Sequence, residues 1–295
     1  MGIIFAAVTA LAWGAWLAPT QRIVFKSNSI RIFHITLSIL VFTFLVMIFT
    51  GGFHGMTSRA FFLSFLGGLI WSTSASIAFN AISKIGMARA AGIWSPLNII
   101  FAMIWGEILF DELQDLGTKN LLLLLISIVI IIAGILMIIF ARGEVKQVQT
   151  KKKMLLGLLG TLIVGFLWGT YFIPVKVSGV SMWMASFPMA VGMFAGGLIF
   201  NLITGGALKL PKKKDYIYTS LSGIFWAVGN YSMFLLVDIV GAGKGFTIAQ
   251  LGIVVNAIIG IFWLRDPKPG TKAAAITFIG IIFATLGGII LGNLK

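Results

Sequence analysis

Apolar residues gather in ten stretches along the chain, each long enough to cross a bilayer as a helix, which takes roughly 20 residues. The stretches cover approximately residues 3–20, 31–50, 61–83, 89–110, 120–140, 154–175, 183–204, 216–238, 244–264 and 273–293. The polar connectors are short, and no stretch alternates polar and apolar positions as an outer-membrane strand does. The pattern therefore predicts an all-α integral membrane protein with ten transmembrane helices.

The two halves of the chain carry the same signals in the same order. Trp13-Gly14 recurs as Trp168-Gly169, 155 positions later, and Pro19 recurs as Pro174. The same displacement pairs Gly68 with Gly223, Trp71 with Trp226, Phe79 with Phe234, Gly86 with Gly241, Arg89 with Lys244, and Asp111 with Asp266. A register kept over so much of the chain indicates an internal duplication.

Positive charge orients the predicted helices. Seventeen of the 22 Lys and Arg residues lie at connectors that follow odd-numbered spans, and five lie on the opposite side. Because cytoplasmic loops carry the excess of Lys and Arg, both termini are predicted to lie outside the cytoplasm. Each half has an odd number of spans, so the second half enters the membrane upside down. We expect two inverted five-helix repeats, 1–141 and 154–295, joined by a basic cytoplasmic linker over 142–153.

Composition excludes several classes of protein. Of the 295 residues 59% are apolar and 10% are charged, whereas a soluble domain carries about 25% charged residues. The net charge of +14 comes from Lys and Arg in the connectors between spans. We therefore expect the lipid bilayer, and not nucleic acid, as a partner. The chain has no cysteine for disulfide or thiolate chemistry.

The residue inventory favours transport over catalysis. Eight carboxylates are present, nearly all at connectors or span ends, so no buried carboxylate pair is available for acid and base catalysis. His34 and His54 are isolated, and no metal-binding pattern occurs. We assign no catalytic residue, metal ligand or cofactor. Inverted repeats are typical of secondary transporters, which bind substrate near the membrane midplane between the repeats.

Polar and aromatic side chains inside the spans suggest a site for a neutral, hydroxyl-bearing substrate, since sugars are bound by amide hydrogen bonds and by stacking on aromatic rings. The wider set is Asn80, Ser95, Asn98, Tyr171, Asn230, Tyr231, Gln250 and Asn256, with Trp13, Trp16, Trp71, Trp94, Trp168 and Trp226. Each of these amides could instead bond only to neighbouring helices. The substrate-binding candidates are Asn230, Gln250, Trp226, Trp13, Trp168, Tyr171, Trp94 and Asn98.

Asn230 and Gln250 are predicted to lie at similar depth. With both termini outside, Asn230 lies about 12 Å and Gln250 about 9 Å from the outer ends of consecutive spans, at about 1.5 Å per residue. Trp226 lies one turn from Asn230 on the same helix face. We therefore expect the two amides to hold one sugar, with Trp226 as its stacking surface.

Three ionisable residues are candidates for coupling and gating. Glu107 lies inside an apolar run, where an ionisable group is costly, and is the candidate for proton coupling; it could instead reach water beside Asp111. Arg89 and Lys244 occupy equivalent positions in the two repeats. They are candidates for the mouths of a shared cavity, or they could extend to lipid headgroups.

Several segments resemble the bacterial glucose/ribose uptake family, the sugar-porter branch of the drug/metabolite transporter superfamily. The resemblance is most specific over 223–264, which includes Gly223, Trp226, Gly229, Asn230, Gly241, Lys244, Gln250 and Gly252, and extends to 85–89, Gly106-Glu107 and Trp13-Gly14. The segment 94–97 departs from the family, which more often has small polar residues and a Gln there.

The resemblance implies a plasma-membrane carrier of ten helices for proton-linked sugar uptake. It places spans 1–4 and 6–9 around the pathway and spans 5 and 10 at the periphery.

We therefore expect a secondary active transporter that takes up a monosaccharide of the glucose or ribose type by alternating access, with the proton as coupling ion in symport. The alternative within transport is a drug/metabolite-type exporter of amino acids or other small metabolites. A membrane sensor that transports nothing is an alternative of a different class. A homodimer is compatible with the sequence, which does not fix the oligomeric state.

Overall fold

The computed structural model describes residues 2–21, 23–50, 55–111, 117–141, 150–206, 208–240 and 242–292. Most of the basic linker predicted at 142–153 lies outside the described residues, as does His54. The helices are α1 (Gly2–Ala15), α2 (Asn28–Thr50), α3 (Ser58–Ile85), α4 (Met87–Phe110), α5 (Thr118–Phe140), α6 (Lys151–Thr170), α7 (Ile173–Val177), α8 (Met182–Ile203), α9 (Lys213–Val240), α10 (Ala242–Ala249), α11 (Gly252–Ile258), the π-helix η1 (Ile259–Trp263) and α12 (Lys272–Gly292). Within the described ranges all regular structure is helical, as the sequence predicts.

Eight helical segments are long and apolar enough to cross a membrane: α2, α3, α4, α5, α6 with α7, α8, α9 and α12. The other two predicted spans are shorter. The first, expected over 3–20, is helical only to Ala15 in α1, and the ninth, expected over 244–264, is divided into α10, α11 and η1. The chain is a multi-pass membrane protein. The prediction of one long continuous helix for each of the first and ninth spans was wrong.

The repeated Trp-Gly stretch ends a helix in both halves. Helix α1 ends at Ala15 and α6 ends at Thr170, positions that are 155 residues apart in the sequence. After Thr170 the chain turns and α7 begins, with Pro174 in its first turn. Proline is favoured there because the missing N–H would have had no partner within the helix. The duplicated sequence therefore codes for a break rather than for a continuous span.

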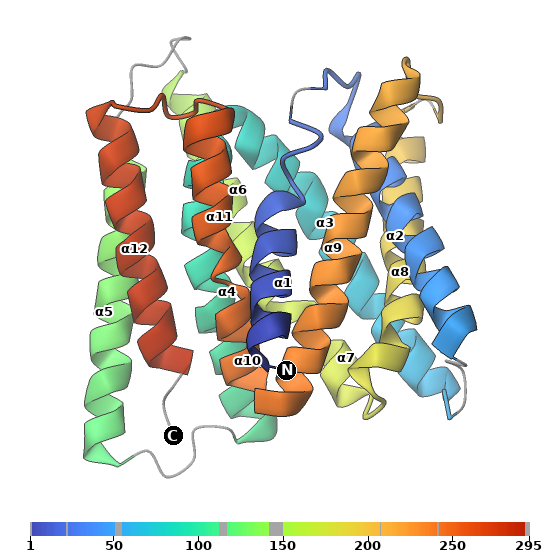
Figure 1. Ribbon diagram of the computed structural model, residues 1–295, viewed down its shortest axis with the longest axis horizontal. Coiled ribbons are helices and arrows are strands. Elements are labelled where there is room, and N and C mark those ends of the chain that lie inside the picture. The colour runs from blue at the N-terminus through green and yellow to red at the C-terminus, as the bar shows by residue number, and fades with distance from the viewer. Residues whose placement is uncertain are drawn as a thin grey trace.

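Helix α1 begins and helix α12 ends at the same end of the bundle (Figure 1). Helices α5 and α12 pack against each other at one edge, and α2 packs against α8 toward the other. Between these edges α1 packs on α9 and α11, while α6 packs on α3 and α4. Spans 5 and 10 are thus peripheral, as the family resemblance implies.

Glycines allow equivalent close contacts in the two halves. A methyl group on Gly68 would lie 2.0 Å from the carbonyl oxygen of Met189, and one on Gly223 would lie 2.6 Å from that of Ile35. Gly223 is the counterpart of Gly68, and Met189 lies 154 positions after Ile35. The helix crossings of α3 with α8 and of α9 with α2 are therefore the same contact made twice.

A second pair of contacts follows the same rule. A methyl group on Gly14 would lie 2.4 Å from Val255 Cβ, and one on its counterpart Gly169 would lie 2.8 Å from Phe101 Cβ. Val255 lies 154 positions after Phe101. Small residues let helix backbones approach closely where apolar side chains gain little from association. These matched contacts support the interpretation of the chain as two copies of one unit.

Candidate functional site

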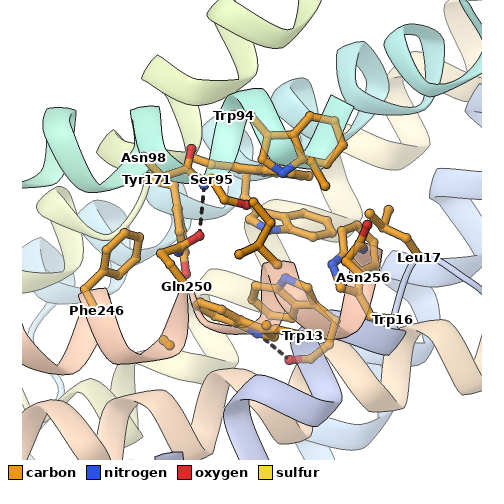
Figure 2. A pocket seen from close by; sticks show the side chains of 17 residues that line it. Trp13, Trp16, Leu17, Trp94, Ser95, Asn98, Tyr171, Phe246, Gln250 and Asn256 are labelled. Carbon is orange, nitrogen blue, oxygen red and sulfur yellow. Dashed lines mark hydrogen bonds between the residues drawn. The ribbon is translucent and has the colours of Figure 1, made fainter. Parts of the chain in front are cut away.

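A cavity lies between helices of both halves, with an empty volume of about 540 Å³ that includes its open side (Figure 2). The lining residues are Trp13, Trp16, Leu17, Trp71, Ala91, Trp94, Ser95, Asn98, Trp168, Tyr171, Trp226, Phe246, Ala249, Gln250, Gly252, Ile253 and Asn256.

Six indole rings dominate the lining. Trp71 and Trp226 have ring centroids 4.7 Å apart, and Trp16 lies 5.6 Å from Trp71. Trp94 meets Trp168 edge to face at 5.1 Å and 87°. Because Trp71 and Trp226 are counterparts in the two repeats, their contact brings equivalent positions together at the centre of the bundle. Rings held by one another offer a rigid apolar surface for a ligand face.

Gln250 reaches the cavity because a helix breaks at its position. Helix α10 ends at Ala249 and α11 begins at Gly252, so Gln250 and Leu251 form a turn between them. The Gln250 side chain is buried and points to Asn98 on α4 (Figure 2). The break therefore places an amide in the cavity wall where a continuous helix had been expected.

The Asn98 amide can be placed in two ways. With its nitrogen away from Gln250 it donates to the main-chain oxygens of Trp94 and Gly165, both at 2.9 Å. With its nitrogen toward Gln250 it donates only to Gln250 Oε1, at 3.5 Å (dashed in Figure 2). We assign the first arrangement, since it makes two shorter hydrogen bonds. Asn98 then joins α4 to α6, and its oxygen faces the Gln250 amide.

Asn256 and Gly14 connect α11 to the end of α1. Asn256 Nδ2 donates to the main-chain oxygen of Gly14 at 3.2 Å, which is available because the last carbonyls of a helix have no partner within it. Trp13, which precedes Gly14 on α1, donates through Nε1 to the main-chain oxygen of Trp226 at 3.3 Å (Figure 2). Both bonds fix cavity side chains to the backbone of another helix.

Asn230 is placed differently from the prediction. It is buried, with 2% of its surface exposed, but it does not line the cavity. Tyr171 lies in the wall, and its hydroxyl donates to Asn230 Oδ1 at 3.4 Å. Tyr171 therefore stands between Asn230 and the cavity, and Asn230 does not share the wall with Gln250 as we had expected.

The other substrate-binding candidates come together in the cavity wall: Gln250, Trp226, Trp13, Trp168, Tyr171, Trp94 and Asn98. Of the wider polar set, Asn80 lies elsewhere, since it is exposed on α3 and donates to the Ser76 main-chain oxygen. The prediction did not include Leu17 or Phe246. Phe246 lies one turn before Gln250, so the helical spacing of α10 could have identified it.

The coupling and gating candidates lie outside the cavity wall. Glu107 is half-buried in the last turn of α4. Lys244 lies in α10, and its side chain is outside the described part of the chain. Arg89, in the first turn of α4, donates to the main-chain oxygen of Ala141 at the end of α5.

Asp266 lies close to Arg89. Although the residue keeps exposed surface, a methyl group on Gly86 would lie 2.4 Å from its Oδ2 atom. Burial raises the pKa of the Asp266 carboxyl above its ordinary value of 3.8, and the charge of Arg89 acts in the opposite direction. Arg89 therefore faces a carboxylate and a carbonyl from two other segments, at a distance from the cavity.

The lining is neutral. Among the described residues that form the wall, none is Asp, Glu, Lys, Arg or His. The polar groups are amides, one serine hydroxyl, one phenol and indole N–H groups. Burying a charged ligand here without a partner of opposite charge would be costly. The chemistry of the wall suits an uncharged ligand that has both apolar faces and hydrogen-bonding groups.

Comparisons with known proteins agree with this chemistry. A family model described as "Sugar transport protein" matches residues 4–294. "Putative sugar uptake protein lmo0176" of Listeria monocytogenes is 29% identical over 307 residues, which cover 100% of this chain and 99% of that protein. "Probable glucose uptake protein GlcU" of Bacillus cereus is 27% identical over 297 residues, with coverage of 100% and 99%.

One solved crystal structure has a similar fold. It matches with a TM-score of 0.61 and 13% identity, and the match covers 100% of this chain and 99% of the other. At this identity the likeness concerns the fold alone. The family model, in contrast, spans nearly the whole sequence. The chain therefore belongs to the sugar transport protein family and is a membrane transport protein rather than an enzyme.

Proposed function

We propose that this protein takes up an uncharged monosaccharide of the glucose or ribose type, and that the aromatic cavity is its binding site. The observation that carries the proposal is the wall itself, which has six indole rings, several amide and hydroxyl groups and no charged side chain among the described lining residues. A sugar has C–H faces that stack on indoles and hydroxyls that bond to amides. The relatives are named as sugar or glucose uptake proteins, and these names support the same class of substrate.

The neutral wall weighs against the alternative of an amino-acid exporter. An amino acid carries an ammonium and a carboxylate, and burying either charge requires a partner. The described lining offers only neutral groups, namely amides, a serine hydroxyl, a phenol and indole N–H groups. A sugar requires no such partner.

Transport would proceed by alternating access between two inverted repeats, 1–141 and 154–295. The matched glycine contacts at Gly68 and Gly223 support this division, as does the position of the cavity between helices of both halves. In inverted-repeat carriers the two halves exchange their arrangements around a central site. The odd number of spans in each half then requires both termini to face the same side, which we propose is outside the cytoplasm.

We propose proton coupling through Glu107. An ionisable group in an apolar segment is costly and is a candidate for function. Because Glu107 is half-buried one turn from the end of α4, it would exchange protons without contact with the sugar.

The test is transport by the purified protein in liposomes. We expect counterflow of labelled glucose or ribose but not of labelled amino acids, and a proton gradient should drive accumulation of the sugar. Glu107→Gln should abolish accumulation while sparing exchange. Asp111→Asn, which changes the next carboxylate along the chain at the exposed end of α4, is the matched control and should keep accumulation.

Counterflow of amino acids without sugars would contradict the sugar site. Proton-driven accumulation by Glu107→Gln at the original rate would remove Glu107 from the coupling mechanism.

A further inference from the structure

Two buried polar atoms of the cavity wall have no hydrogen-bond partner among the residues that the structure describes: Trp168 Nε1 and Asn256 Oδ1. Both residues line the cavity, and only 7% of Trp168 and 3% of Asn256 is exposed. Leaving such atoms unpaired costs free energy, so natural proteins rarely do so without a reason. One atom is a donor and the other an acceptor, and a hydroxyl group can serve both.

The Asn256 amide has a fixed orientation. Its nitrogen donates to the Gly14 main-chain oxygen at 3.2 Å, so the oxygen is the atom that remains. The contact depends on close approach of α1 and α11, since a methyl group on Gly14 would lie 2.7 Å from the Gly252 main-chain oxygen. The backbone thus holds Asn256 so that it presents an acceptor, not a donor.

Trp168 differs from its counterpart in the first repeat. Trp13 Nε1 donates to the main-chain oxygen of Trp226, whereas Trp168 Nε1 has no such partner. The ring of Trp168 is held by Trp94 at 5.1 Å and by Trp16 at 6.0 Å. The equivalent indole N–H groups therefore differ: that of Trp13 is bonded within the protein, and that of Trp168 is buried without a partner in the described part of the chain.

Two other amides near the cavity already have protein partners. Asn98 donates to two main-chain oxygens, and Asn230 accepts from Tyr171. A ligand that met only these two groups would compete with protein hydrogen bonds, whereas one that met Trp168 and Asn256 would complete them.

We propose that Trp168 Nε1 and Asn256 Oδ1 recognise hydroxyl groups of the substrate: the indole N–H donates to a hydroxyl oxygen, and the Asn256 oxygen accepts a hydroxyl hydrogen. The inference rests on the proposed sugar site and adds to it the two atoms that decide specificity. Neither group recognises an analogue that has hydrogen in place of the hydroxyl. A site built to bond a hydroxyl discriminates strongly against such an analogue, because its own polar group is then left unpaired.

Calorimetric titration of the purified full chain with D-glucose, D-ribose and the monodeoxyglucoses tests the proposal. We expect the wild type to bind at least one deoxyglucose about tenfold more weakly than glucose, a difference of about 1.4 kcal/mol. Asn256→Ala should bind that analogue and glucose equally, while penalties for loss of other hydroxyls remain. Trp168→Phe, which keeps an aromatic ring and removes the N–H, should abolish the penalty for the hydroxyl that it recognises.

Matched controls remove the same groups away from the cavity. Asn80→Ala deletes an amide on the exposed side of α3, and Trp105→Phe deletes an indole N–H that donates to Thr170 Oγ1 at 2.8 Å. Both controls should show the wild-type pattern of deoxyglucose penalties. Trp168→Phe also tests the proposal by itself if Asn256→Ala, which loses the bond to Gly14, fails to fold.

Two outcomes would separate the possible failures. If the wild type binds glucose or ribose but both variants keep every deoxyglucose penalty, or lose affinity evenly for all analogues, the two groups are structural and the inference is wrong. If the wild type binds none of these sugars, the proposed function itself is wrong, and this inference is lost with it.

Discussion

At the scale of single residues, Asn230 and Gln250 show what depth alone can and cannot predict. The helical rise places two amides at a similar height, but it does not say which other side chain lies between an amide and the ligand. Tyr171, which is 59 positions from Asn230 in the sequence, occupies that place. A single sequence gives no signal for such a distant contact, whereas Gln250 lies in the cavity wall without another residue in between.

The two amides should therefore respond differently to substitution. We expect Gln250→Ala to weaken sugar binding by roughly tenfold, about 1.4 kcal/mol, with little loss of folded protein. Asn230→Ala should instead lower the free energy of unfolding by about 1–3 kcal/mol, because the buried Tyr171 hydroxyl loses its acceptor.

A double-mutant cycle checks the second expectation. Adding Tyr171→Phe to Asn230→Ala removes both partners, so the double variant should be less destabilised than the sum of the two single variants. Additive losses in thermal unfolding would show that the Tyr171–Asn230 bond does not contribute.

At the scale of helices, the first turn of α4 joins three segments. Arg89 donates to Ala141 at the end of α5, and the carboxylate of Asp266 packs on Gly86. These contacts connect the start of α4 to the end of α5 and to the segment that precedes α12. The sequence had suggested Arg89 as a mouth residue, and the structure adds the segments that it holds.

Substitutions at this junction should have unequal effects. Arg89→Gln should lower the free energy of unfolding by about 1–2 kcal/mol, because it loses a charged hydrogen bond. Asp266→Asn should change it by less than about 1 kcal/mol, since the residue is partly exposed and burial disfavours its charged form.

The direction of the Asp266 pKa shift predicts how the stability of Arg89→Gln changes with pH. A carboxyl whose pKa is raised by folding binds its proton more tightly in the folded state. Its favourable contribution is complete below the ordinary value of 3.8 and is lost as pH rises through the folded-state pKa. Removing Arg89 should raise that pKa further, so acidification should recover part of the loss in Arg89→Gln. A deficit in unfolding temperature that is the same at every pH would contradict this account.

The helix breaks were only partly predictable. Pro174 marks the start of α7 in the sequence, but nothing comparable marks Gln250 and Leu251, where apolar residues continue on both sides. The hydropathy pattern predicts a continuous span there, because a buried turn and a buried helix have the same apolar composition. The number and order of the spans could thus be predicted from the pattern, whereas the interruption that brings Gln250 into the cavity wall could not.

At the scale of the whole molecule, the absence of cysteine from the chain makes its orientation directly testable. We expect Lys119→Cys, at the start of α5, to react with a membrane-impermeant maleimide in intact cells. Lys212→Cys, before α9, should react only after permeabilisation. Both lysines are exposed, so access from one side of the membrane decides the result. The reverse pattern of labelling would invert the topology.

The π-helix η1 restores the register between the two copies. Arg89 and Lys244 lie 155 positions apart, as do Asp111 and Asp266, but the contact counterparts Phe101 and Val255 lie 154 apart. The second copy is therefore one residue shorter before Val255 and one residue longer after it, and α4 contains no irregular turn where η1 lies. The N–H of Leu264 donates to the oxygen of Ile259, five positions earlier, in a ring one residue larger than that of an α-helix. We infer that the wider turn of η1 accommodates the additional residue after Val255 and so brings Asp266 back into register with Asp111. Deleting one residue there should restore a regular helix and rotate the segment that carries Asp266 by about 100° relative to Arg89.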